Sequence, residues 1–413
     1  MAVTCSSPEQ VHLAFGNDET QMTVSWASND TKSAFVEYGT SETVLSSVTN
    51  GTTQTCTAGG WKGYLHHADL SGLDASTTYF YRVGGLSEVF SFRTKPGKED
   101  RTPVKIIAYG DMGTPGDVHG PGANYTVEFC ESVIEDLDFV LHVGDIPYDK
   151  GDEFVWDGES LSLSLSLTPS HINKQTHTEF FRGVQGYAAS VPYMVCPGNE
   201  DHAYDFVGYL SRFRMPGSKS LNSSWFYSFD YSYVHVISIS TEYISREPGS
   251  EQYEFLEADL KNVNRTATPF VVMIGHRPLY CSSNDYYDCN MWAPRARETL
   301  EPLLSQYDVD LYICGHVHSY ERTYPVLNGT RVSETYANPN ATTHVMVGGA
   351  GAGLSKTWSH DQPEWSASRI INYAVGMIEI PDETTMHWKL VSTHTSGTDG
   401  QGGEVLDQIT ITK

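Results

Sequence analysis

The sequence predicts two domains of different fold class, an N-terminal all-β sandwich over residues 1–97 and an α/β domain over residues 103–413. Three observations support this division. Short, aromatic-rich runs separated by turn residues fill the first part of the chain, at a spacing typical of a sandwich. From Val104 onward, near-continuously apolar runs alternate with stretches of helical periodicity, as expected for strands covered on both faces. Between the two patterns lies KPGKEDRTP, a charged segment with Gly and two Pro that is typical of a linker.

In the N-terminal domain, five runs have the composition of strands. They are VHLAF, MTVSW, FVEYGT, TTYFYRV and VFSFRT, at residues 11–15, 22–26, 35–40, 77–83 and 89–94. Trp26 and either Tyr79 or Tyr81 are predicted to anchor the core, because aromatic side chains bury large areas. The segment LSGLDASTTYFYRVGG resembles the late strands of fibronectin type III domains. His66 and His67 belong to this domain and have no set of partners that indicates a site.

The second half alternates between strand and helix patterns, which predicts an α/β fold. Strands are expected at 104–109, 138–143, 192–197, 233–240, 269–274, 310–314 and 343–347. Helices are expected at 124–137, 251–263 and 295–307, where apolar residues recur on one face. The Ser-Leu repeat at 160–167 fits either an amphipathic edge strand or an insertion, and no function is assigned to it.

The chain carries 51 acidic and 26 basic side chains, for a net charge of −25. Such a surface repels nucleic acid and anionic membranes, so neither is expected as a partner. No apolar run approaches the roughly 18 residues that span a bilayer. A small anionic substrate would require a local reversal of this field, and a bound metal pair would provide it.

Other features favour secretion or a lysosomal or vacuolar location. The start MAVTCSSPEQ lacks a signal peptide, which fits a mature secreted chain but also a cytosolic protein. The N-x-[ST] pattern predicts N-linked glycans at some of seven positions. These positions are Asn29, Asn50, Asn124, Asn222, Asn264, Asn328 and Asn340.

The seven cysteines divide into two groups. Cys281 and Cys289 bracket a polar loop, while Cys5 and Cys56 both lie near the N-terminus, so each pair is a candidate disulfide. Three others lie in apolar runs and are predicted to be buried thiols; they are Cys130, Cys196 and Cys314. The odd count leaves an interchain disulfide, and with it the oligomeric state, open.

Five of the predicted strands end in a small polar motif that contains Gly. The motifs are GDMG with Asp111, GDIPY with Asp145 and Tyr148, PGNED with Asn199, GHRP with His276, and GHVH with His316 and His318. Sites in open α/β sheets form at the carboxyl ends of strands, and Gly allows the backbone to approach an ion closely. This mixed oxygen and imidazole set exceeds the needs of one tetrahedral ion and suits two ions that share a carboxylate.

The order GDMG, GDIPY, GN, GH and GHVH, followed by HSYER, resembles the calcineurin-like metallophosphoesterases. The position of Tyr148 narrows the resemblance to the purple acid phosphatases, in the large form that carries an N-terminal fibronectin III-like domain. The match spans Pro8 to Lys413. It implies two packed mixed sheets flanked by helices, with the C-terminal part from about residue 340 completing the second sheet.

The resemblance also implies an acid phosphatase, a metal-dependent hydrolase of phosphate monoesters in which metal-bound hydroxide attacks phosphorus. One ion, Fe(III), would be held by Asp111, Asp145, Tyr148 and His318. The second ion, Fe(II), Zn(II) or Mn(II), would be held by Asp145, Asn199, His276 and His316. The substrate would be a small phosphorylated molecule. Alternatives on the same fold are a phosphodiesterase or nucleotide pyrophosphatase, and a metal-binding glycoprotein with weak catalysis.

The motif around Asn199 departs from the family pattern, which has His directly after the Asn. Here Glu200 occupies that place and His202 follows two positions later. Three interpretations stay open: His202 substitutes for the missing His, protonated Glu200 acts as the catalytic donor, or the site binds metals but turns over slowly or acts on a different substrate. The loop CSSNDYYDCN after His276 contains no His either, although plant members use such residues to hold substrate.

Overall fold

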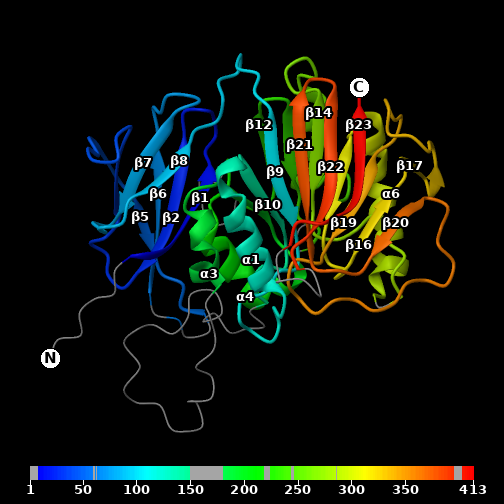
Figure 1. The fold of residues 1–413 in the computed structure, drawn as a ribbon, viewed down its shortest axis with the longest axis horizontal. Helices are drawn as coiled ribbons and strands as arrows, with labels where there is room; N and C mark the ends of the chain where they lie inside the picture. Colours follow the sequence, from blue (N-terminus) through cyan, green and yellow to red (C-terminus); the bar gives the residue numbers. More distant parts are fainter. Residues whose placement is uncertain are drawn as a thin grey trace, which may run out of the picture.

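The computed structural model describes residues 8–58, 61, 63–148, 180–217, 224–242, 246–284, 286–394 and 402–413. The Ser-Leu repeat, Cys5 and Asn222 lie outside these residues. Figure 1 shows an all-β unit at the N-terminal end of the chain, beside a larger unit in which two sheets and several helices are layered. The predicted fold class, an all-β domain followed by an α/β domain with mixed sheets, is confirmed.

Two four-stranded sheets form the N-terminal unit. Their strands, in spatial order, are β1 (Glu9–Phe15), β2 (Met22–Ser28), β6 (Tyr64–Leu70) and β5 (Thr52–Gln54), and β4 (Ser47–Asn50), β3 (Phe35–Gly39), β7 (Thr78–Val83) and β8 (Phe90–Arg93). Trp26, Tyr79 and Tyr81 are buried in the core, as predicted. The sequence did not predict β6, because two adjacent histidines interrupt its apolar pattern, yet it pairs with β2 over seven residues.

The six-stranded sheet of the larger unit combines parallel and antiparallel pairs. Its order is β11 (Tyr193–Cys196), β10 (Phe139–Val143), β9 (Val104–Tyr109), β21 (Ala374–Asp382), β22 (Thr385–Ser392) and β23 (Val405–Thr412). The first three strands are parallel and fully or almost fully buried. Their carboxyl ends therefore meet at one edge.

The seven-stranded sheet has a parallel centre and antiparallel margins. Its order is β12 (Tyr227–Tyr231), β13 (Val234–Ser238), β14 (Phe270–Ile274), β15 (Leu311–Cys314), β19 (Thr343–Val347), β16 (Tyr320–Thr323) and β20 (Ser366–Ile370). A separate short ribbon pairs β17 (Val326–Leu327) with β18 (Thr330–Arg331). The C-terminal part supplies strands to both large sheets, since β19 and β20 belong to the seven-stranded sheet and β21 pairs along β9 of the six-stranded sheet.

Five α-helices lie within the described residues: α1 (Ala123–Ser132), α3 (Phe180–Ala188), α4 (Ala203–Arg212), α5 (Glu251–Asn262) and α6 (Asp288–Gln306). The 3₁₀ turn η2 (Ile134–Asp136) lies between α1 and β10, and η4 (Asn199–Asp201) lies between β11 and α4. The helix expected at 124–137 ends early and continues as η2. The helix expected from residue 295 begins at Asp288, with that acidic residue in its first turn, where the helix dipole favours a negative charge.

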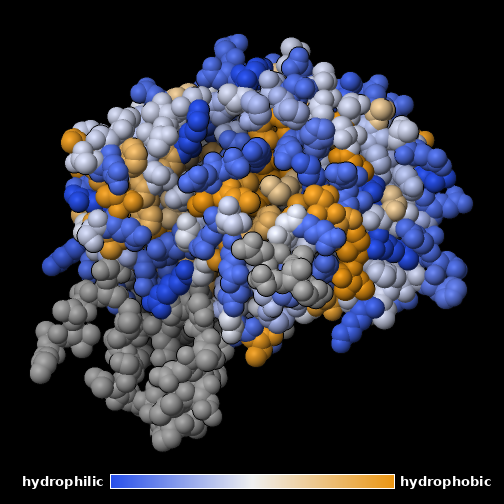
Figure 2. Space-filling model, in the orientation of Figure 1, coloured by the Kyte–Doolittle hydropathy of each residue, from blue (hydrophilic) through white to orange (hydrophobic). Residues whose placement is uncertain are grey.

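Most buried side chains form one core that runs from the sandwich into the six-stranded sheet and a second around α5 and α6, and a third, small cluster surrounds Trp61. The Cys281–Cys289 disulfide is confirmed, and Cys130, Cys196 and Cys314 are buried, as predicted. None of the helices in the described part of the chain is long and apolar enough to cross a bilayer. Hydrophilic residues cover most of the face drawn in Figure 2, with smaller apolar groups between them.

Candidate metal centre

The polar motifs predicted from the sequence follow β9, β10, β11, β14 and β15, and the two large sheets bring them together. Four of the motif residues have left-handed backbone conformations. These are Asp111 (φ 60°), Asp145 (φ 52°), Tyr148 (φ 59°) and His316 (φ 70°). Non-glycine residues in this region are strained, and such strain concentrates at functional sites.

At two of the motif glycines, neighbouring atoms approach so closely that no side chain fits. A Cβ on Gly198 would lie 2.1 Å from the backbone N of Asp145. A Cβ on Gly315 would lie 2.3 Å from Asp111 Oδ2. Both contacts are far below the separation that a side chain tolerates, so only glycine permits these loops to pack together.

The first ligand group combines Asp111, Asp145 and His318, whose ligand atoms lie within 4.8 Å of one another. The Tyr148 hydroxyl lies 2.7 Å from His318 Nε2 and 3.3 Å from Asp111 Oδ1. His318 Nδ1 lies 2.8 Å from the Gly353 carbonyl, to which it donates. This bond leaves the Nε2 lone pair of neutral His318 directed at the oxygen ligands.

The second group combines Asp145 with His276 and His316, again within 4.8 Å. His276 Nδ1 lies 2.9 Å from the Val143 carbonyl, so its Nε2 faces Asp145 Oδ1 at 3.2 Å and Asn199 Oδ1 at 3.1 Å. His316 Nδ1 is buried and has no hydrogen-bond partner in the described part of the chain. Asp145 belongs to both groups, which is the arrangement that two ions bridged by one carboxylate require.

The electrostatics of the cluster also fit a bound cation. Burial alone would lower the pKa of His276, but the adjacent Asp145 carboxylate raises it to about 10. Burial and the charges of Asp111 and Asp145 raise the pKa of Tyr148 well above its usual value. A metal ion would replace the proton on His276 and stabilise a Tyr148 phenolate, so the residues present fit a metal pair.

The two residues that follow Asn199 are placed differently. The backbone N of Glu200 donates to Asp145 Oδ1 at 2.7 Å, and its Oε1 accepts from Asn199 Nδ2 at 3.1 Å. The second bond turns Asn199 Oδ1 towards His276. His202 is exposed, and its Nδ1 lies 2.5 Å from the Asn199 carbonyl, to which it donates.

Sequence reasoning missed a carboxylate that fixes the loop after β10. Asp201 is fully buried and accepts from the backbone N of Gly198 (2.8 Å), Ile146 (2.9 Å) and Asp145 (3.1 Å). These three bonds hold the strained Asp145 backbone in place. The second acidic residue of PGNED was the available signal, since a carboxylate in a turn commonly accepts backbone N–H groups.

An aromatic ring from the loop after His276 also packs on the centre. Tyr286 makes edge contacts with His316 and His318, at ring-centroid distances of 5.2 and 5.8 Å. Burial and the charge of Asp111 raise the pKa of Tyr286. Its hydroxyl is therefore neutral and able to donate. From the sequence, this loop was noted only for containing no His, and Tyr286 was not assigned a role.

Comparisons with known proteins followed the same division of the chain. Residues 8–94 match the family described as purple acid phosphatase, N-terminal domain. Residues 104–320 match calcineurin-like phosphoesterase, and residues 341–408 match iron/zinc purple acid phosphatase-like protein C.

Individual relatives cover nearly the whole chain. The chain is 32% identical to acid phosphatase type 7 of Homo sapiens over 435 residues, which covers 99% of this chain and 91% of the relative. It is 30% identical to purple acid phosphatase 18 of Arabidopsis thaliana, covering 93% and 80% of the two chains. Purple acid phosphatase PPD1 from yellow lupin (Lupinus luteus) seeds superposes with a TM-score of 0.83 at 26% identity, covering 98% of this chain and 74% of the lupin chain.

Proposed function

Since this chain belongs to the purple acid phosphatase family, we propose that it hydrolyses phosphate monoesters at a dinuclear metal centre. The observation that carries the proposal is the pair of ligand groups that share Asp145. The proposed ligands are the seven strand-end residues, Asp111, Asp145, Tyr148, Asn199, His276, His316 and His318. Their donor types support Fe(III) on the side of Asp111 and Tyr148, with Fe(II), Zn(II) or Mn(II) on the imidazole-rich side.

The chain's own residues prepare this centre. When bound, the two ions neutralise the phosphate charge and activate the attacking water. The Val143 and Gly353 carbonyls fix the tautomers of His276 and His318, so that each presents Nε2 to the centre. Glu200 orients the Asn199 amide so that its oxygen faces the same point. The fixed dipoles are in place before the substrate arrives, which is how such sites stabilise a transition state.

A direct test measures metal content, colour and turnover on one purified sample. The proposal expects two metal ions per chain, a visible absorbance band from a Tyr148 phenolate on Fe(III), and phosphate release from p-nitrophenyl phosphate between pH 4 and 8. A colourless protein without iron would overturn the ferric assignment. A protein loaded with two ions that releases no phosphate would overturn the enzymatic proposal.

We further propose that Glu200, rather than His202, protonates the leaving group. The Glu200 carboxyl group accepts from Asn199 and its backbone N donates to Asp145, so the residue lies beside the centre, whereas His202 is exposed and donates to a backbone carbonyl. General acid assistance typically contributes about 10²- to 10⁴-fold, and it matters most for poor leaving groups. Glu200→Gln should therefore slow hydrolysis of glycerol phosphate far more than that of p-nitrophenyl phosphate, whose leaving group needs no proton.

His202→Ala serves as the matched control and should leave both rates close to those of the wild-type protein. Equal losses on the two substrates in Glu200→Gln would indicate that Glu200 only orients Asn199. A selective loss in His202→Ala would instead assign the proton to His202. Glu200→His tests whether the residue usual in the family raises turnover.

The carboxylate of Glu200 also favours a second candidate, a metal-binding glycoprotein with slow turnover, because a negative charge beside a phosphate opposes binding. Rates on p-nitrophenyl phosphate, bis(p-nitrophenyl) phosphate and a nucleoside diphosphate, compared on one preparation, separate this candidate from a monoesterase and from a diesterase or pyrophosphatase.

We also propose a secreted or lysosomal location with N-linked glycans. The disulfide at Cys281 supports an oxidising compartment. Five of the seven predicted acceptor asparagines are exposed in the structure: Asn50, Asn124, Asn264, Asn328 and Asn340. A fall in apparent mass after glycosidase treatment of the protein from its native source would support this location, and an unchanged mass would contradict the glycans.

A further inference from the structure

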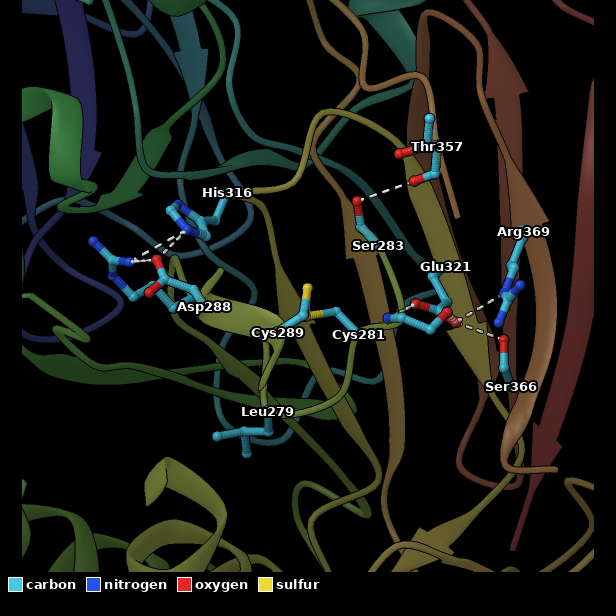
Figure 3. The surroundings of a disulfide bond; sticks show 12 residues. Leu279, Cys281, Ser283, Asp288, Cys289, His316, Glu321, Thr357, Ser366 and Arg369 are labelled. Atoms are coloured by element: carbon cyan, nitrogen blue, oxygen red, sulfur yellow. Dashed lines mark hydrogen bonds and ion pairs between the residues drawn. A yellow bond between two sulfur atoms is a disulfide. The ribbon is translucent and has the colours of Figure 1, made fainter. Parts of the chain in front are cut away.

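A disulfide-closed loop reaches the metal centre from the side of α6 (Figure 3). Cys281 and Cys289 are bonded across eight positions of the chain. Asp288 directly precedes Cys289 and is the first residue of α6. In Figure 3 its side chain points away from the disulfide and towards His316. The loop therefore presents a carboxylate to one of the proposed ligands.

The contacts of Asp288 determine which ring nitrogen of His316 carries the proton. Asp288 Oδ2 lies 2.8 Å from His316 Nε2 and also bonds Arg277 Nη1. Arg277 Nη1 also lies 3.2 Å from His316 Nε2. Because the Asp288 carboxylate oxygen can only accept, Nε2 carries a proton directed at Asp288, and Arg277 donates to the same oxygen. Arg277 is held in turn by Glu242, which accepts from Nε at 2.9 Å. A proton on Nε2 leaves the lone pair of His316 on Nδ1.

Nδ1 is the nitrogen of His316 that is buried without a hydrogen-bond partner in the described residues. A buried imidazole nitrogen that meets no donor or acceptor is costly unless something else occupies its lone pair. The same ring belongs to the ligand group with Asp145 and His276. These observations together assign Nδ1 to a metal ion and Nε2–H to Asp288.

The other end of the loop is anchored independently. Glu321 of β16 is 1% exposed and accepts from the backbone N of Ser282 at 2.8 Å and from its hydroxyl at 2.5 Å. The Ser366 hydroxyl donates to the same carboxylate at 2.6 Å. Figure 3 draws this bond as a dashed line. The disulfide and this buried carboxylate fix both ends of the segment that carries Asp288.

We propose that Asp288 is a positioning residue for the second ion, acting through His316, and that the Cys281–Cys289 disulfide holds it there. The inference rests on the proposed dinuclear centre. Asp288 orients the His316 ring and selects its tautomer. Its bonds within the described part of the chain go to His316 and Arg277, and neither residue belongs to the ligand set proposed for the other ion. Outer carboxylates of this kind typically change metal affinity by about 10- to 100-fold.

The test compares three proteins: wild type, Asp288→Ala and, as the control, Glu298→Ala. Glu298 is an exposed acidic residue on the same helix. Full-length proteins loaded with both ions are dialysed against graded chelator, and iron and divalent metal are counted per chain. The expected result is a second ion lost at about 10- to 100-fold lower chelator concentration in Asp288→Ala only. The visible Tyr148 band should persist in all three proteins, since the first ion stays bound.

Several results would overturn the inference. Equal retention of the second ion in Asp288→Ala and Glu298→Ala would do so, as would simultaneous loss of both ions from Asp288→Ala. If Asp288→Ala does not fold, Asp288→Asn supplies the test, because it keeps the volume and an acceptor but removes the charge, and it should lie between wild type and alanine. A wild-type protein that binds fewer than two ions would sink the proposed centre itself, which separates the two failures.

The double variant Cys281→Ser with Cys289→Ser tests the role of the disulfide. It should weaken retention of the second ion in the same direction as Asp288→Ala but by less, because the Glu321 contacts still hold one end of the loop. Unchanged retention in the double variant would remove the disulfide from the proposal.

Discussion

Buried histidines occur in both units of the molecule, and their surroundings are opposite. In the sandwich, His67 Nδ1 lies 2.8 Å from the Ser25 hydroxyl and its Nε2 lies 3.0 Å from the Ser211 carbonyl. Burial among these neutral groups lowers the pKa of His67 to about 3. At the proposed centre, His276 is also buried, but Asp145 raises its pKa to about 10. The difference in pKa therefore comes from the groups that each ring contacts, because both rings are buried.

A third buried histidine sharpens the comparison. His235 lies between Asp230 (2.6 Å) and Asp259 (2.8 Å), which raise its pKa to about 9 against the effect of burial. Both of its ring nitrogens bond carboxylates, so no lone pair remains for an ion. Nearby carboxylates alone therefore do not make a metal histidine. In the two proposed ligand histidines, one ring nitrogen instead faces an acceptor outside the ligand set, the Val143 carbonyl for His276 and Asp288 for His316, which leaves the other nitrogen for an ion.

The largest effect is expected from the carboxylate that belongs to both ligand groups. Asp145→Asn removes the charge that two ions would share, and it should lower turnover of p-nitrophenyl phosphate by at least about 10³-fold, comparable to the loss of a key electrostatic group in other enzymes. Metal content measured on the same sample should fall for both ions. A variant that keeps both ions and more than a tenth of the wild-type rate would contradict the bridging assignment.

A matched pair of substitutions compares the two units directly. His67→Leu strands the Ser25 hydroxyl, while Gln54 Nε2 still donates to the Ser211 carbonyl, so it should lower the free energy of unfolding by about 1–2 kcal/mol while metal content stays at the wild-type level. His276→Leu should remove the second ion while the protein remains folded. Urea unfolding followed by circular dichroism, together with metal analysis, checks both. Loss of metal in His67→Leu would show that the two sets of histidines are not independent.

Sequence reasoning singled out the proposed strand-end ligands because each comes at the end of an apolar run, as Asp111 does after β9 and His316 after β15. The same local signal did not exist for Asp201 or Asp288. Their roles depend on which backbone groups and rings the folded loops bring to them, and for Asp288 on a disulfide that closes the loop.

As with the site, the parts of the fold that could be predicted are those with a local sequence pattern. Near-continuously apolar strands such as β10 and β14 were recognisable, because burial on both faces removes polar residues from them. The strand β6 was missed because its two buried histidines read as polar, although Ser and Thr hydroxyls satisfy them. The return of β21 to the first sheet was missed because strand order is set by long-range pairing, which local patterns do not encode.

The last comparison concerns His235, whose contribution to stability depends on pH with a defined sign. The pKa of His235 is about 9 in the folded protein against 6.5 as the reference value, so the folded state binds more protons between these limits. Its stabilising contribution is therefore complete below pH 6.5 and is lost as the pH rises through 9. One proton limits the slope to about 1.4 kcal/mol per pH unit, and the exposure of Asp230 reduces it further.

Urea unfolding of wild type and His235→Gln at intervals from pH 5 to 10 measures this contribution. The difference in unfolding free energy should be constant up to pH 6.5 and shrink towards pH 9. His360→Gln is the control, because His360 also lies beside a carboxylate, Asp361, but both are almost fully exposed. Its difference from wild type should be small at every pH, since solvent screens an exposed pair. Parallel profiles for wild type and His235→Gln would show that neither Asp230 nor Asp259 holds the proton on this ring.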